Sequence, residues 1–110
     1  MAKFTHTLGG NFDTVLNRIE QGILDASVSA TLEDGWDVRD GASRCAVRVF
    51  ERYSYAGGNR VSMNIPLFQG DGPIRLCAIT SGGSQAVFFK VNTWGEAAFL
   101  DTLKAVVQNL

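Results

Sequence analysis

The stretch that decides the fold spans residues 44–67 and reads RCAVRVFERYSYAGGNRVSMNIPL. Apolar and polar residues alternate through both ends of this stretch, at the period of two that is typical of β-strands. The glycine-rich residues 56–59 suit a hairpin loop, because glycine accepts the positive φ that tight loops require. The pattern therefore predicts an antiparallel pair of strands over residues 44–55 and 60–67. Pro66 cannot donate to a strand ladder, so we expect it at an edge, a bulge or the strand end.

Further strands are predicted on both sides of this pair. Alternating or continuous apolar runs indicate strands over residues 3–8, 26–33, 74–80 and 86–91. Residues 34–43 contain the turn-forming dipeptides Asp34-Gly35 and Asp40-Gly41, and we expect them to be a connection. The run over 86–91 is apolar on both sides, which predicts a central or doubly covered strand.

Two helices are predicted beside these strands. Asn11 can accept amide hydrogen bonds as an N-cap, and an apolar stripe follows it at helical spacing. Thr93-Trp94-Gly95-Glu96 fits a capping box, in which Thr93 and Glu96 bond reciprocally, and this predicts the start of a C-terminal helix. The element order is then β-α-β-β-β-β-β-α. We expect an α+β fold, an antiparallel β-sheet meander of five to six strands with two helices packed on one face.

Composition limits the class of protein. Of the 110 residues 45% are hydrophobic and 19% are charged, as expected for a single globular domain over residues 1–110. Ten Lys plus Arg against eleven Asp plus Glu leave a net charge of −1, so neither nucleic acid nor a membrane is an expected partner. The sequence lacks the apolar stretch of a signal peptide or a membrane span, and we expect a cytoplasmic location.

The two cysteines give no sign of a metal site or a disulfide framework. Cys45 and Cys77 lack paired spacing, and we expect reduced thiols whose side chains lie on opposite faces of the sheet. The chain has no nucleophile, paired-carboxylate, phosphate-loop or metal-ligand motif, so no cofactor or metal is expected. These observations favour a noncatalytic role over an enzyme.

Three arginines recur on one side of the strand predicted over residues 44–55. Arg44, Arg48 and Arg52 are spaced by four residues, with Phe50 between the last two. Arginine and aromatic side chains on an open sheet could stack on bases. Because the chain has neither a basic balance nor an RNA-binding motif, a solvated row that pairs with Glu33 is favoured instead.

Two polar groups are expected at one end of the sheet. Glu51, Arg52 and Tyr53 lie where the long strand loses its apolar pattern and could bind a small polar ligand, although a surface ion pair of Glu51 with Arg60 is the simpler interpretation. The segment 81–85 could present amides and hydroxyls to an anion, although its place between two strands favours a plain connection. The candidate ligand-binding rim comprises Glu51, Arg52, Tyr53, Ser81, Gly82, Gly83, Ser84 and Gln85.

Three short segments resemble a family of short bacterial proteins of unknown function: ERYS at residues 51–54, TSGGSQ at 80–85 and NTWGE at 92–96. The resemblance implies a small stand-alone bacterial domain without an established activity. The element order is also similar to that of helix-grip proteins, which hold apolar ligands between a curved sheet and a C-terminal helix. This chain is short for that fold, which puts a large cavity in doubt.

The function favoured by these features is a small noncatalytic binding or protein-interaction module with a polar ligand rim at one end of the sheet. A small enzyme and an apolar-ligand carrier of the helix-grip type are the alternatives. We also expect a homodimer through the sheet face that the helices leave uncovered, because apolar centres with charged rims are typical of interfaces. Val47 is expected to point toward the helices, and Phe50, Cys77 and Ile79 are expected on the uncovered face.

Overall fold

The structure is a computed structural model that describes residues 1–53, 60–82 and 89–110. These residues form β1 (Ala2–Leu8), α1 (Phe12–Ala26), β2 (Thr31–Asp40), β3 (Ser43–Tyr53), β4 (Arg60–Gln69), β5 (Ile74–Gly82) and α2 (Phe89–Gln108).

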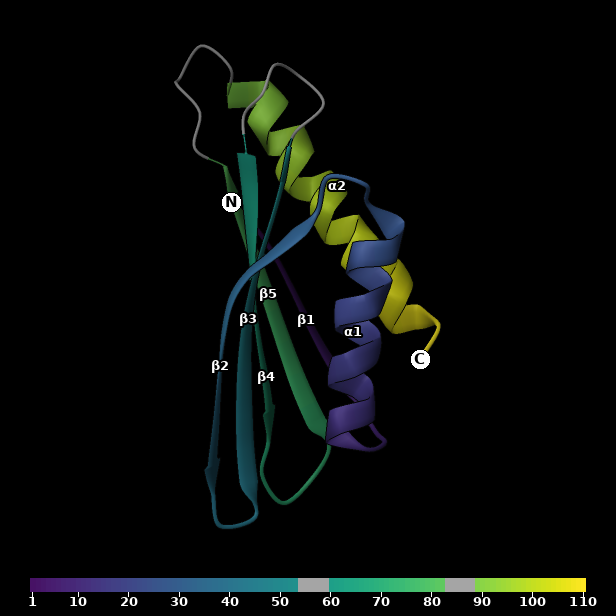
Figure 1. Ribbon diagram of the computed structural model, residues 1–110, viewed down its shortest axis with the longest axis vertical. Coiled ribbons are helices and arrows are strands. Elements are labelled where there is room, and N and C mark those ends of the chain that lie inside the picture. The colour runs from purple at the N-terminus through teal and green to yellow at the C-terminus, as the bar shows by residue number, and fades with distance from the viewer. Residues whose placement is uncertain (54–59, 83–88) are drawn as a thin grey trace.

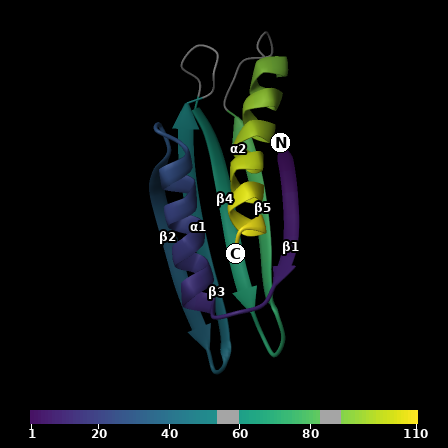
Figure 2. The same ribbon diagram turned by 90° about the vertical axis from the view of Figure 1, so that its right-hand side faces the viewer.

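The strands of the described residues make one sheet in the order β1-β5-β4-β3-β2, and every neighbouring pair is antiparallel. Strands β2 to β5 form a meander, whereas α1 carries the chain from β1 at one edge to β2 at the other (Figure 2). Both helices lie on the same face of the sheet, with α1 over the β2 and β3 side and α2 over the β4, β5 and β1 side (Figures 1 and 2). The predicted α+β architecture is confirmed.

The core lies between the sheet and the helices. Alternate side chains of β4 and β5 are buried, as the period of a strand requires when one face is covered. The apolar stripe of α1 is buried in the same core, and the N-cap is formed as predicted, because the Asn11 side chain accepts from the Thr14 amide at 3.0 Å. The largest fully buried apolar side chains are Phe50, Phe99, Ile19, Ile23, Met63, Leu67, Ile74, Leu103 and Val61.

Residues 34–40 are strand rather than the predicted connection. Strand β2 runs from Thr31 to Asp40, so the predicted strand over 26–33 is confirmed only for residues 31–33, and α1 continues through Ala26. The hairpin turn follows at Gly41, whose φ is +59°. Gly35 is not part of a turn. Its missing side chain makes room for Arg48, because a Cβ there would lie 3.0 Å from Cδ of Arg48.

The start of α2 corrects the prediction for the C-terminal segment. Residues 89–91 belong to α2 and not to a strand, and 86–88 lie outside the described residues. A short run that is apolar on all sides suits a buried helix as well as a strand, so periodicity alone could not decide. Thr93 lies inside α2 and cannot be its N-cap. The Glu96 carboxylate instead accepts from the Gly82 amide at 2.9 Å.

Pro66 occupies the central strand β4, not an edge, a bulge or a strand end. It lies opposite Val47 of β3. On the other side, the ladder between β4 and β5 runs to the pair Asn64 and Ile79 and resumes in the same register at Leu67 and Leu76. The break falls around the residue that has no amide hydrogen to donate, so the sheet accommodates the proline by omitting local pairing.

Close packing of the two helices gives a first prediction. A Cβ on Gly22 of α1 would lie 2.6 Å from Cγ1 of Val106 on α2. Gly22→Ala is therefore expected to lower the free energy of unfolding by about 1–2 kcal/mol, because overpacking outweighs the better helix propensity of alanine. Chemical denaturation measures the change. In a Val106→Ala background the same substitution should cost clearly less, because only the contact at 3.2 Å with Cβ of position 106 remains, and equal losses in both backgrounds would contradict this explanation.

Candidate functional site

The sheet face away from the helices, here called the open face, carries an apolar surface. Strand registers align its side chains in three rows from β1 to β2. The first row is Lys3, Ile79, Asn64, Val49 and Asp34. The second is Thr5, Cys77, Pro66, Val47 and Trp36, in which Cys77 and Pro66 continue the register of the flanking pairs. The third is Thr7, Arg75, Phe68, Cys45 and Val38.

Large apolar side chains of these rows are accessible. Trp36 is 62% exposed, Phe68 45% and Ile79 39%, while Val47 and Val49 at the centre are half-buried. Antiparallel sheets that face water on one side usually alternate apolar and polar residues. Here the side chains that point away from the core are also largely apolar, which is typical of a surface that binds a macromolecule.

The open face is hollowed on its β1, β5 and β4 side. A hollow of about 570 Å³ is lined by Thr5, His6, Thr7, Pro66, Phe68, Arg75, Leu76 and Cys77. Trp36 lies on the opposite side, on the edge strand β2. The face therefore has an exposed indole near one edge and a concavity near the other.

Opposite charges lie at the two edges of the first row. Lys3 stands on β1 and Asp34 on β2, with the uncharged Ile79, Asn64 and Val49 between them. Arg75 adds positive charge on the β5 side. Glu51 and Arg60 neutralise one another at 3.0 Å, so they contribute little to this asymmetry. The β1 and β5 side of the open face is thus basic, and the β2 edge is acidic.

The structure divides the candidate ligand-binding rim between the two faces of the sheet. Glu51 and Tyr53 lie on the open face, where Glu51 pairs with Arg60 as the simpler interpretation predicted. Ser81 shares that face, with its hydroxyl 3.1 Å from the hydroxyl of Ser62. Arg52 points the other way, 4.5 Å above the ring of Phe99.

The glycine-rich part of the rim is described only at its start. The amide of Gly82 donates to the buried Glu96 carboxylate, which also pairs with the amino group of Met1 at 3.1 Å. Gly83, Ser84 and Gln85 lie outside the described residues. Of the eight candidates, Glu51, Tyr53 and Ser81 are therefore the ones that the structure brings to one surface.

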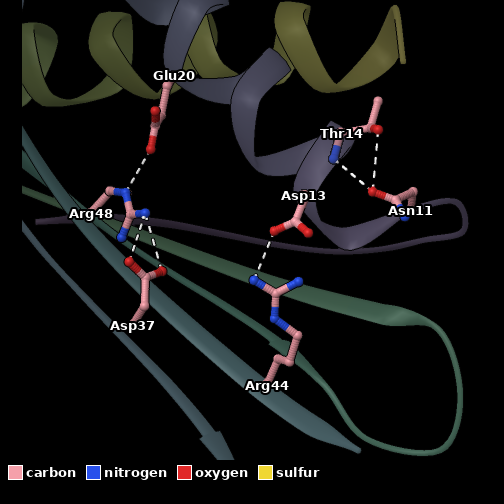
Figure 3. Close-up of polar contacts among 7 residues, drawn as sticks. All are labelled: Asn11, Asp13, Thr14, Glu20, Asp37, Arg44 and Arg48. Atoms are coloured by element: carbon pink, nitrogen blue, oxygen red, sulfur yellow. Dashed lines mark hydrogen bonds and ion pairs between the residues drawn. The ribbon is translucent and has the colours of Figure 1, made fainter.

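The row of arginines is not solvated and does not pair with Glu33. Arg44, Arg48 and Arg52 point toward the helices, where their guanidinium groups contact Phe12, Glu20 and Phe99. Figure 3 shows Arg44 and Arg48 reaching carboxylates on α1. Arg48 donates from Nε to Glu20 at 2.6 Å and from Nη2 to Asp37 at 3.1 Å. Burial disfavours the charged form of Arg48, but these two carboxylates outweigh it and raise its pKa.

Arg44 is held in a similar way near the start of α1. Its guanidinium lies 4.3 Å above the ring of Phe12. It also donates to Asp13 at 2.8 Å (Figure 3). The hydrogen bond from Arg44 lowers the pKa of the Asp13 carboxyl below its usual value. The pair therefore stabilises the fold above the ordinary pKa of aspartate, and this contribution is lost as the pH falls through the lowered pKa.

The predicted faces of β3 are reversed. Phe50 is fully buried on the helix side, and Val47 lies on the open face. Cys45 and Cys77 are both free and both on the open face, not on opposite faces. They lie two strands apart, which exceeds the reach of a disulfide. Acidic residues on α1 were the signal that could have assigned the arginines to the helix side.

The described residues contain no cluster of His, Cys, Asp or Glu suited to a metal ion. Neither helix of the described residues has both the length and the apolar character needed to cross a membrane.

Fold and surface together define an α+β protein whose antiparallel sheet has one face covered by helices and one apolar open face. The chain belongs to the family of unknown function DUF6054, whose family model matches residues 1–110. No curated protein and no solved structure gives a significant match.

Proposed function

We propose that this protein is a small noncatalytic interaction module that forms a homodimer through the open face. The observation that carries the proposal is the exposure of Trp36, Phe68 and Ile79 around the half-buried Val47 and Val49. An apolar, aromatic-containing centre is the composition that distinguishes the core of a protein interface from ordinary surface. Symmetric pairs are the commonest closed assemblies, and one self-complementary patch is sufficient to build one.

The polar residues at the end of β3 suit the rim of this interface. The Glu51 and Arg60 ion pair and the bonded hydroxyls of Ser62 and Ser81 satisfy one another within the monomer. Groups of this kind stay solvated at an interface edge without leaving an unpaired charge. A small polar ligand at this end would have to compete with those internal contacts.

The alternative of a helix-grip carrier has less support. In such a protein the apolar ligand lies between the sheet and the C-terminal helix. Phe50, Met63 and Phe99 are fully buried in that region of this chain.

Free, partly accessible cysteines suit the reducing cytoplasm, where we place the protein.

Sedimentation equilibrium tests the homodimer. The wild type is expected to exceed the monomer mass of 11.9 kDa at micromolar concentration. Val47→Asp should raise the dissociation constant by at least about tenfold, because it buries an unpaired carboxylate at the centre of the interface. Val28→Asp is the matched control, since Val28 is exposed outside the sheet. A wild type that stays at 11.9 kDa throughout would refute the homodimer.

A further inference from the structure

We infer that the two copies pack open face to open face about a two-fold axis parallel to the strands, so that Trp36 of each copy enters the hollow of the other. This inference rests on the proposed homodimer and specifies its geometry. Strand β4 is the central strand of the described sheet and lies along the axis. The rotation then exchanges the edges, so that β5 faces β3 and β1 faces β2 of the second copy.

Charge complementarity selects this axis. In the first row Lys3 and Asp34 occupy opposite edges of the sheet, with Ile79 and Val49 at matching positions between edge and centre. A rotation about the strand direction brings Lys3 against Asp34 twice and Ile79 against Val49 twice. A rotation about an axis across the strands would instead bring the basic β1 and β5 side against the same side of the second copy, and the acidic β2 edge against the same edge, so that like charges would gather on each side. Like charges across an interface are strongly disfavoured.

The same rotation aligns the indole with the concavity. Trp36 ends the second row on β2, and Thr5 occupies the equivalent place on β1, with Cys77 beside it on β5. These two residues line the hollow of about 570 Å³. An exposed tryptophan that fills a pocket on the partner is a frequent source of binding energy at interfaces. Two sheets in this arrangement pack with their strands nearly aligned, as in β-sandwiches.

A charge-exchange experiment tests the axis. Lys3→Glu and Asp34→Lys are each expected to raise the dissociation constant about tenfold, because each creates two like-charge contacts. The double variant should return to within about threefold of the wild type, since the pairs are restored with their signs reversed. Trp36→Ala should raise the dissociation constant more than either charge variant. Trp36→Phe should raise it less than Trp36→Ala, because phenylalanine still fills part of the hollow. Additive losses in the double variant would overturn the inference.

A thiol experiment reads the geometry directly. In a background without Cys45 and Cys77, a Val49→Cys variant and an Ile79→Cys variant are oxidised separately and as a mixture. Disulfide-linked dimer is expected only in the mixture, because Val49 faces Ile79 of the second copy, and inter-sheet disulfides occur in sandwiches. Linkage within either variant alone would place Val49 or Ile79 against the same residue of the second copy, which a rotation about an axis along the strands does not allow, and would overturn the inference.

The outcomes separate the two proposals. A dimer that Val47→Asp dissociates, but that neither the charge variants nor Trp36→Ala weaken, keeps the proposed homodimer and rejects this geometry. A wild type that is monomeric at all concentrations rejects both, and leaves the open face to a partner of different sequence.

Discussion

Phe50→Ala is expected to lower the free energy of unfolding by about 3–5 kcal/mol, the usual loss when a buried phenylalanine is replaced by alanine. Phe50 has no exposed surface and belongs to the core between the sheet and the helices. Its removal loses the transfer free energy of the ring and leaves a cavity that stiff neighbouring strands cannot fill completely. Chemical denaturation at a concentration where the chain is monomeric measures the effect without a contribution from association.

The adjacent residue is the matched control. Val49 lies on the open face and is half-buried, so Val49→Ala should cost less than about 1 kcal/mol in the monomer. The two substitutions therefore report which side of β3 faces the core. If Val49→Ala proved the more destabilising of the two, the assignment of faces in β3 would be wrong.

Much of the fold could be predicted from the sequence because the local signals and the burial agree. The alternation of β4 and β5 places most of their aliphatic residues on one side, and the stripe of α1 follows an N-cap that is formed. Where the apolar residues lie on one side, the period alone identifies the covered face. The meander and both helices follow from such segments.

The faces of β3 could not be predicted because both of its sides carry apolar residues. One side offers Cys45, Val47 and Val49, and the other alternates arginine with Ala46 and Phe50. The charged side is the buried one. Arginine stems can cover apolar surface while the guanidinium reaches a carboxylate. The assumption that the less charged side of β3 faces the core therefore assigned the wrong side. The partners belong to α1 and β2, which are distant in sequence.

The open face was only partly predicted for a related reason. Trp36 follows Asp34-Gly35, and turn-forming residues concealed a strand whose glycine makes room for Arg48. Trp36 could therefore be placed on the open face only from the pairing of β2 with β3. Ile79 and Cys77 were placed on the correct face, because β5 has an unambiguous period.

Arg48→Ala is expected to destabilise the protein by roughly 2–4 kcal/mol, because removing one member of a largely buried ion pair leaves its partner without compensation. The Arg48 side chain is 12% exposed and joins Glu20 of α1 to Asp37 of β2. The substitution thus removes the polar link between the first helix and the edge of the sheet, and leaves the Glu20 carboxylate, itself only 21% exposed, without its cation.

Two further variants show whether that loss comes from the unpaired carboxylate. Arg44→Ala is the matched control on the same face of β3, and it should cost clearly less than Arg48→Ala because its partner Asp13 is 63% exposed. Replacing Arg48 and Glu20 together by methionine should recover most of the stability, since apolar groups of similar length leave no buried charge. Urea denaturation of the variants measures these differences. If the double replacement were as unstable as Arg48→Ala, although methionine keeps a stem of similar length, the hydrogen bonds of the guanidinium itself, and not the unpaired carboxylate, would account for the loss.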